Sequence, residues 1–104
     1  MKKIILKKLG NEGESGVLYY KEMIKNLLQF PQDAQKGFTV DEIRANLRIL
    51  EALEKSDTEL TLEDADHEKL KTIIESAKFG MAHKNIVEFV DDIKQAENIE
   101  IKKE

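Results

Sequence analysis

The residues with the widest chemical repertoire in this chain are its two histidines, His67 and His83. They are sixteen residues apart, and neither has the H-E-x-x-H or H-x₃-H spacing of a metal-binding helix. A shared metal site would need carboxylates from other parts of the chain. We interpret His67, in the first turn of a predicted helix, and His83, in the turn before another, as hydrogen-bonded residues at the surface or its boundary.

Acidic residues are the second group with chemical potential, and six of them lie within residues 57–68. A calcium loop starting at Asp64 needs glycine at its sixth position, where Lys69 stands, so an EF-hand is excluded. Acids at a helix N-terminus are favoured by the helix dipole, and a solvated face explains the others. The alternative is a docking surface for a basic partner. Its candidate residues are Glu59, Glu63, Asp64, Asp66 and Glu68.

Nucleophilic catalysis and cofactor binding have no recognisable signature. The chain has no cysteine and no G-x-S-x-G motif. The glycine-rich segment 10–16 is followed by Val17 where a phosphate-binding loop needs lysine. Asp91 and Asp92 are adjacent on a predicted helix and therefore point about 100° apart, which excludes a carboxylate dyad. The sequence therefore predicts a protein that is not an enzyme and that has no catalytic residue, cofactor or metal site.

A helix-turn-helix is the strongest nucleic-acid interpretation. The segment 37–43 resembles the opening of winged-helix elements, and Arg44 and Arg48 follow one turn apart. A predicted strand, not a second helix, comes next, and the charge balance is unfavourable for binding phosphates. Nine basic and six acidic residues give residues 1–50 a net charge of +3, whereas eight and fifteen give residues 51–104 a net charge of −7. This asymmetry favours a protein partner or head-to-tail self-association.

Length and composition set the frame for these residues. A chain of 104 residues predicts a single domain over 1–104, with 102–104 as a frayed tail. The absence of cysteine suits a reducing compartment. Only three apolar residues follow the first lysines, too few for a signal peptide, and no apolar run approaches the ~20 residues that span a bilayer. We therefore expect a soluble cytoplasmic protein without membrane contact.

The periodicity of apolar residues predicts an α+β fold. Four helices pack on a small two- or three-stranded sheet in the order β-α-α-β-α-α-(β). The predicted strands are 2–9, 58–63 and a last one at 99–101. The first helix carries an apolar face from Tyr20 to Leu28 and ends before Pro31. Residues 17–19 fit either its first turn or a strand that pairs back onto 2–9.

Three helices remain. The second begins with a capping box of Thr39 and Glu42. The third is expected to be capped by Asp64 or Asp66 and to end near Gly80, and the fourth to start near Asn85. The predicted buried stripe of the second helix is Ile43, Leu47, Leu50 and Leu53. The inward residues of the third are Leu70, Ile73, Ile74 and Ala77, and those of the fourth are Ile86, Phe89, Val90 and Ile93.

Segments 37–44, 60–67 and 86–93 together resemble small accessory proteins encoded by tailed phages and prophages. The resemblance covers residues 17–96 and implies a short protein that binds another macromolecule, with no catalytic residue to transfer. The sequence thus predicts a non-enzymatic interaction protein that docks on a protein partner or self-assembles. The alternatives are a DNA-contacting regulator of transcription or replication and an acidic inhibitor of a nucleic-acid-binding protein. The acidic run and the terminal strands 2–9 and 99–103 are the two candidate contact surfaces.

Overall fold

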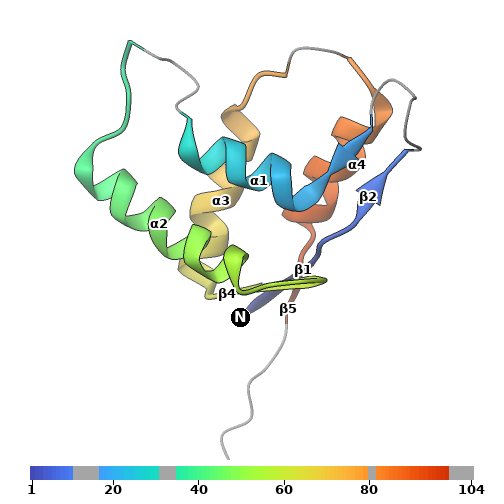
Figure 1. The fold of residues 1–104 in the computed structure, drawn as a ribbon, viewed down its shortest axis with the longest axis horizontal. Coiled ribbons are helices and arrows are strands. Elements are labelled where there is room, and N and C mark those ends of the chain that lie inside the picture. The colour runs from blue at the N-terminus through green and yellow to red at the C-terminus, as the bar shows by residue number, and fades with distance from the viewer. Residues whose placement is uncertain (11–16, 31–34, 80–81, 99–104) are drawn as a thin grey trace, which may run out of the picture.

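The computed structural model describes residues 1–10, 17–30, 35–79 and 82–98, and its α+β class with four helices agrees with the prediction (Figure 1). The elements follow the order β-β-β-α-α-β-α-α-β, with more short strands than expected. Their bounds are β1 Lys2–Ile5, β2 Lys8–Leu9, β3 Leu18–Tyr19, α1 Tyr20–Gln29, α2 Val40–Glu54, β4 Glu59–Leu62, α3 Asp64–Ser76, α4 Lys84–Lys94 and β5 Glu97–Asn98.

The larger sheet has the antiparallel order β4-β1-β5. Its inner face is apolar because Leu60 and Leu62 of β4 and Ile4 of β1 are all buried, as the alternating sequence of β4 predicts. The first strand lies between two neighbours, so residues 2–5 of the candidate surface at the terminal strands are not at an edge, whereas β4 and β5 are. The predicted strand 99–101 and the frayed tail lie outside the described residues.

A pair of two-residue strands resolves the ambiguity at residues 17–19. Leu18 and Tyr19 pair with Leu9 and Lys8 as β3 and β2, so this segment is a strand that folds back on the N-terminus. The predicted strand 2–9 is therefore two strands, β1 and β2. The apolar face of α1 is buried as expected, at Tyr20, Ile24, Leu27 and Leu28.

Helix α2 begins as predicted but turns a different face inward. The Thr39 hydroxyl accepts from the Glu42 backbone N–H, and the Glu42 carboxylate accepts from the Thr39 N–H, so the capping box is confirmed. Ile43 and Leu47 are 41% and 56% exposed, which contradicts their predicted burial. The buried face consists of Asn46, Ile49, Leu50 and Leu53. It packs against α1, α3 and β4.

The ends of α3 and α4 differ in detail from the predictions. The N-cap of α3 is Glu63, whose side chain makes no capping hydrogen bond, so neither Asp64 nor Asp66 is the cap. Helix α3 ends at Ser76, before the predicted Gly80, which lies outside the described residues. Leu70 and Ile74 are buried and Ile73 and Ala77 are half-buried. In α4, Phe89 and Ile93 are buried, and Ile86 and Val90 pack against the core.

Two buried polar side chains contact carbonyl oxygens at the C-terminal ends of helices. The Asn46 amide donates to the backbone oxygen of Leu28, near the end of α1, at 3.1 Å. His67 Nε2 lies 2.7 Å from the backbone oxygen of Ile93, near the end of α4. Because the last carbonyls of a helix have no partner within it, each contact gives a terminal carbonyl a buried donor, and the Ile93 oxygen also accepts from the Ala96 N–H at 3.4 Å. Among the helices described, none is long and apolar enough to cross a membrane.

Candidate functional site

The acidic residues of 57–68 are placed along β4 and the first turns of α3. Glu59 on β4, Glu63 at the N-cap of α3 and Glu68 within α3 are all exposed. Among the described residues these three carboxylates form no ion pair, so they present negative charge to solvent. They form the part of the predicted docking surface that is open to a partner, and "acidic face" denotes these three residues below.

The other two candidates, Asp64 and Asp66, have partners within the chain. The Asp64 carboxylate lies 3.2 Å from the amino group of Met1, and its side chain is 69% exposed. Asp66 accepts from the Arg48 guanidinium at 3.1 Å, and its side chain is only 16% exposed. Both lie in the first turn of α3, where the helix dipole favours negative charge. Asp66 thus connects α3 to α2 and presents little of its charge to solvent.

The outer edge of β4 runs beside the acidic face. The Leu6 N–H donates to the Thr58 oxygen at 2.8 Å, which fixes the alternation of hydrogen bonds between β1 and β4. With this alternation, the backbone N–H and C=O groups of Leu60 and Leu62 point toward β1. Those of Glu59 and Thr61 point away from it. No described strand pairs with this side of β4. An edge of this kind can accept a further strand.

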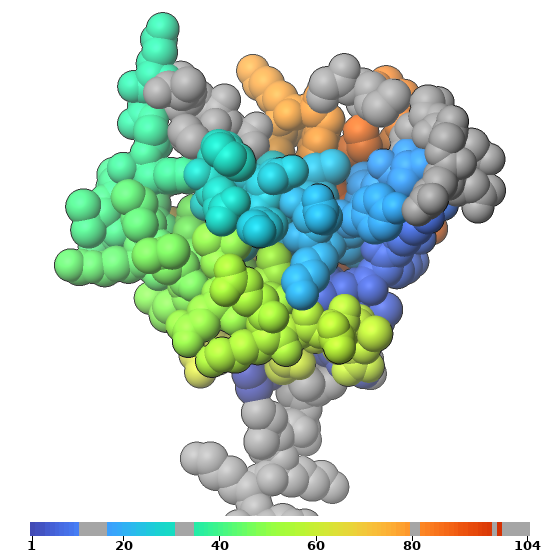
Figure 2. Space-filling model, in the orientation of Figure 1, coloured from blue at the N-terminus to red at the C-terminus, as the bar shows by residue number. Residues whose placement is uncertain are grey.

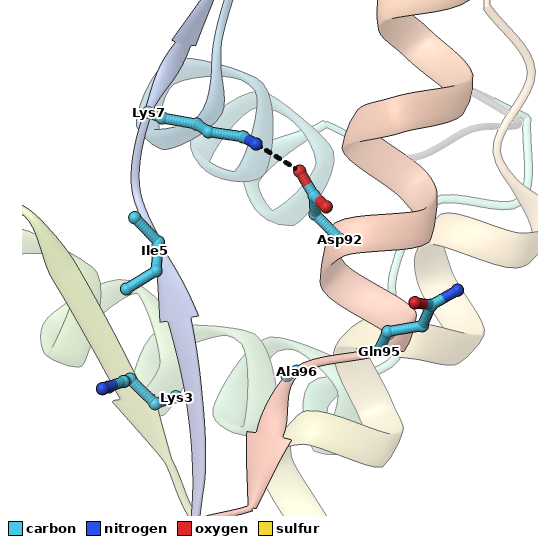
Figure 3. A pocket seen from close by; sticks show the side chains of 6 residues that line it. All are labelled: Lys3, Ile5, Lys7, Asp92, Gln95 and Ala96. Carbon is cyan, nitrogen blue, oxygen red and sulfur yellow. Dashed lines mark ion pairs between the residues drawn. The ribbon is translucent and has the colours of Figure 1, made fainter.

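A second polar group gathers where α4 passes the end of β1 (Figure 3). Asp92 accepts from the hydroxyl of buried Tyr20, and Lys7 Nζ lies 3.0 Å from the same carboxylate oxygen. The ammonium group of Lys7 also lies 5.7 Å from the centroid of the Tyr20 ring, in reach of a cation–π contact. A hollow of about 180 Å³ opens beside it, with Ile5 and Gln95 in its lining.

The chemistry of this group is that of a structural contact. Burial, followed by the hydrogen bond to Asp92, raises the pKa of the Tyr20 hydroxyl above its ordinary value. A tyrosine shifted in that direction keeps its proton at neutral pH, whereas a general acid or base needs a pKa near the working pH. The Tyr20 ring also packs edge-on against Phe89, with centroids 5.0 Å apart. The group therefore fastens α4 to α1 and to the segment after β1.

No pattern in the sequence links Lys7, Tyr20 and Asp92. The tyrosine stands on an apolar helix face, the lysine lies thirteen residues before it and the aspartate seventy-two residues after it. Their contact depends on the tertiary arrangement of three elements, and the only available signal is that a buried tyrosine hydroxyl needs a partner.

The histidines occupy structural positions. His67 is 3% exposed, so its predicted place at the surface or its boundary is wrong, although the predicted hydrogen bond exists. His83 is the N-cap of α4, and its Nδ1 accepts from the Asn85 backbone N–H at 3.1 Å. In the described part of the chain, no three His, Cys, Asp or Glu side chains are grouped as metal ligands.

The two arginines of the helix-turn-helix interpretation diverge. Arg48 is held by Asp66, and Arg44 lies 3.9 Å from Asp41 on the exposed side of α2. The element after α2 is strand β4, as the sequence predicts, and not a recognition helix. No protein-family model, curated protein or solved structure matches this chain.

Proposed function

We propose that this protein is a non-enzymatic interaction protein that docks on a protein partner along the outer edge of β4. The observation that carries this proposal is the pair of residues, Glu59 and Thr61, whose backbone N–H and C=O groups point away from β1. Addition of a strand to such an edge supplies affinity through main-chain hydrogen bonds. The partner segment is therefore extended.

Charge defines the composition of that segment. The acidic face, Glu59, Glu63 and Glu68, lies along the edge and at the start of α3, so an extended segment with lysine or arginine side chains fits it best. Electrostatic complementarity of this kind raises the association rate and selects among partners, and salt weakens it. A basic nucleic-acid-binding protein meets the same criteria, which makes inhibition of such a protein one outcome of docking.

The setting follows from composition and from the phage resemblance. A chain without cysteine suits the reducing cytoplasm, or the host cytoplasm for a phage-encoded accessory protein. Direct contact with DNA is the competing function. It is less favoured because Arg48 is paired with Asp66 and the net charge is −4. A gel shift with nanomolar, salt-dependent affinity for duplex DNA would favour the competing function.

The experiment isolates a binding partner and then measures its affinity for matched variants. The triple variant E59Q/E63Q/E68Q removes the three charges of the acidic face. E22Q/E88Q/D91N removes three exposed charges elsewhere. Thr61→Pro deletes a backbone N–H on the outer edge and leaves the pairing with β1 intact, because proline is tolerated where the N–H faces solvent. Thr61→Val is its control.

We expect E59Q/E63Q/E68Q and Thr61→Pro each to weaken partner binding at least tenfold, and the two controls to bind like the wild type. Circular dichroism establishes that each variant is folded before affinity is measured. If both test variants fold and keep wild-type affinity, β4 is not the docking edge.

A further inference from the structure

Helix α2 carries a second apolar stripe that the fold does not bury. Val40, Ile43 and Leu47 are 63%, 41% and 56% exposed. Their spacing of three and four residues places them on one side of the helix, next to the buried face at Leu50. Helix α2 forms an outer flank of the molecule, seen in green at the left of Figures 1 and 2, with α1 and α3 on its inner side.

This stripe differs from isolated surface hydrophobics, which need no explanation. Three large aliphatic side chains in one row form a continuous apolar strip, and such strips on a helix are typical of packing against another helix. The core of the chain closes without them, since Ile49, Leu50 and Leu53 supply the contribution of α2. The stripe is therefore available for contact with another molecule.

Two opposite charges beside the stripe define the occupant. Arg44 precedes Leu47 by three residues and Glu51 follows it by four, and both lie on the same flank of the stripe. In a second α2 running parallel, this flank faces the opposite flank of the partner, so Arg44 and Glu51 do not meet. A second α2 related by a two-fold axis through Leu47 runs antiparallel and places Arg44 opposite Glu51 of the partner subunit. The same operation places Ile43 beside Leu50 of the partner subunit.

Both charges are available for that pairing. Arg44 is 75% exposed and lies 3.9 Å from Asp41, at the limit of an ion pair. Glu51 is 70% exposed and pairs with Lys55 one turn later, at 3.2 Å. Exposed pairs of this kind contribute little to stability, so exchanging them for contacts across an interface costs little. In a two-fold interface every such contact forms twice.

We propose that this chain forms a homodimer in which the stripes of two α2 helices pack antiparallel about a two-fold axis at Leu47. The dimer uses none of the residues of the acidic face. The interface is self-complementary in two ways, because leucine meets leucine on the axis and Arg44 meets Glu51 of the partner subunit on both sides of it. In the antiparallel arrangement the two helix dipoles also point in opposite directions, which is favourable.

Sedimentation equilibrium at about 10 to 300 µM tests the dimer, a range that covers micromolar dissociation constants. We expect the wild type to dimerise and Leu47→Asp to raise the dissociation constant at least tenfold. Val87→Asp replaces an equally exposed residue on α4 and is expected to leave the constant unchanged. A wild type that stays monomeric throughout the range, or a folded Leu47→Asp variant that dimerises normally, overturns the proposal.

Charge exchange tests the direction of packing. Arg44→Glu and Glu51→Arg should each weaken the dimer several-fold, because each places like charges together twice. The double variant R44E/E51R restores opposite charges in the antiparallel pair and should recover wild-type affinity. In a parallel pair Arg44 and Glu51 do not face each other, so the double variant would show no recovery beyond the sum of the two single changes. Failure of the double variant to recover affinity overturns the two-fold antiparallel arrangement.

Disulfide trapping locates the axis, because the chain contains no cysteine of its own. Two Leu47→Cys side chains on a two-fold axis meet at a distance that a disulfide can bridge. We expect the Leu47→Cys variant to form a covalent dimer on mild oxidation, at a rate at least tenfold that of the Val87→Cys control. Equal rates for the two variants would place Leu47 away from the axis and overturn the proposal.

Discussion

The two apolar faces of α2 consist of similar residues but differ in burial. Ile49, Leu50 and Leu53 are buried, whereas Val40, Ile43 and Leu47 lie in solvent. Both sets have helical spacing and consist of aliphatic side chains, so neither composition nor periodicity separates them. The buried set differs in that it contains Asn46, which sits in the middle of the buried face and donates to the Leu28 oxygen at the end of α1. This polar contact anchors the buried face to α1.

Truncation of the buried face gives the largest expected effect. Leu53→Ala should lower the free energy of unfolding by about 2–5 kcal/mol, because Leu53 is 1% exposed and its loss leaves a cavity. Denaturant unfolding followed by circular dichroism measures this. A cost below ~1 kcal/mol would mean that the buried face is not where the structure places it.

The buried hydrogen bond of Tyr20 gives a reference energy with which the loss at Asn46 can be compared. Tyr20→Phe removes the hydrogen bond to Asp92 and should cost about 1.5–3 kcal/mol, the range for a bond to a charged group. The raised pKa adds a pH signature. The neutral hydroxyl stabilises the folded state below the ordinary tyrosine pKa of about 10, and this contribution is lost as pH rises above it.

The stability of the wild type should therefore fall more steeply than that of Tyr20→Phe between about pH 9 and 11. All other side chains are common to the two proteins, so the difference between the two curves reports Tyr20. Parallel curves would contradict the buried hydrogen bond.

Removal of Asn46 tests how far this contact anchors the buried face. Asn46→Ala leaves the Leu28 carbonyl without its donor and should cost about 1–3 kcal/mol. Asn26→Ala, an exposed asparagine on α1, is the control and should stay within ~0.5 kcal/mol. Thermal unfolding of the two variants side by side gives the comparison, and equal values would show that Asn46 anchors nothing.

The start of α2 should respond less than its buried face. Thr39→Ala removes the side-chain half of the capping box and should cost about 1 kcal/mol. Thr39→Ser keeps the hydroxyl and should retain most of the stability. Chemical denaturation distinguishes these results, and equal losses for alanine and serine would exclude capping as the cause.

The exposed stripe should show the smallest effect on the monomer. Leu47→Ala is expected to change stability by less than ~0.5 kcal/mol when measured at a concentration where the protein is monomeric, because Leu47 is more than half exposed. The sequence pattern alone assigns Leu47 the same cost as Leu50. A loss above ~2 kcal/mol would restore that assignment and remove the distinction between the two faces.

Features that depend on neighbouring residues are predictable from the sequence. The capping box at Thr39 and the alternation in β4 are local, and both are confirmed. Which face of α2 is buried is not a local property, because an asparagine among leucines is expected to be exposed unless its hydrogen-bond acceptor is known. The Lys7, Tyr20 and Asp92 contact fails for the same reason. Of the acidic residues, their position near a helix start was predictable, but the pairing of Asp66 with Arg48 was not.

The central place of β1 has a consequence for synthesis. Its neighbours in the sheet begin at Glu59 and Glu97, so one partner strand is made only after roughly ninety further residues. At about 5–20 residues per second the ribosome exposes β1 for several seconds before β5 emerges. Helices α1 and α2 follow each other in the chain and can associate during that interval. The sheet is therefore completed late, by closure of a long loop, and that step should limit the rate of folding.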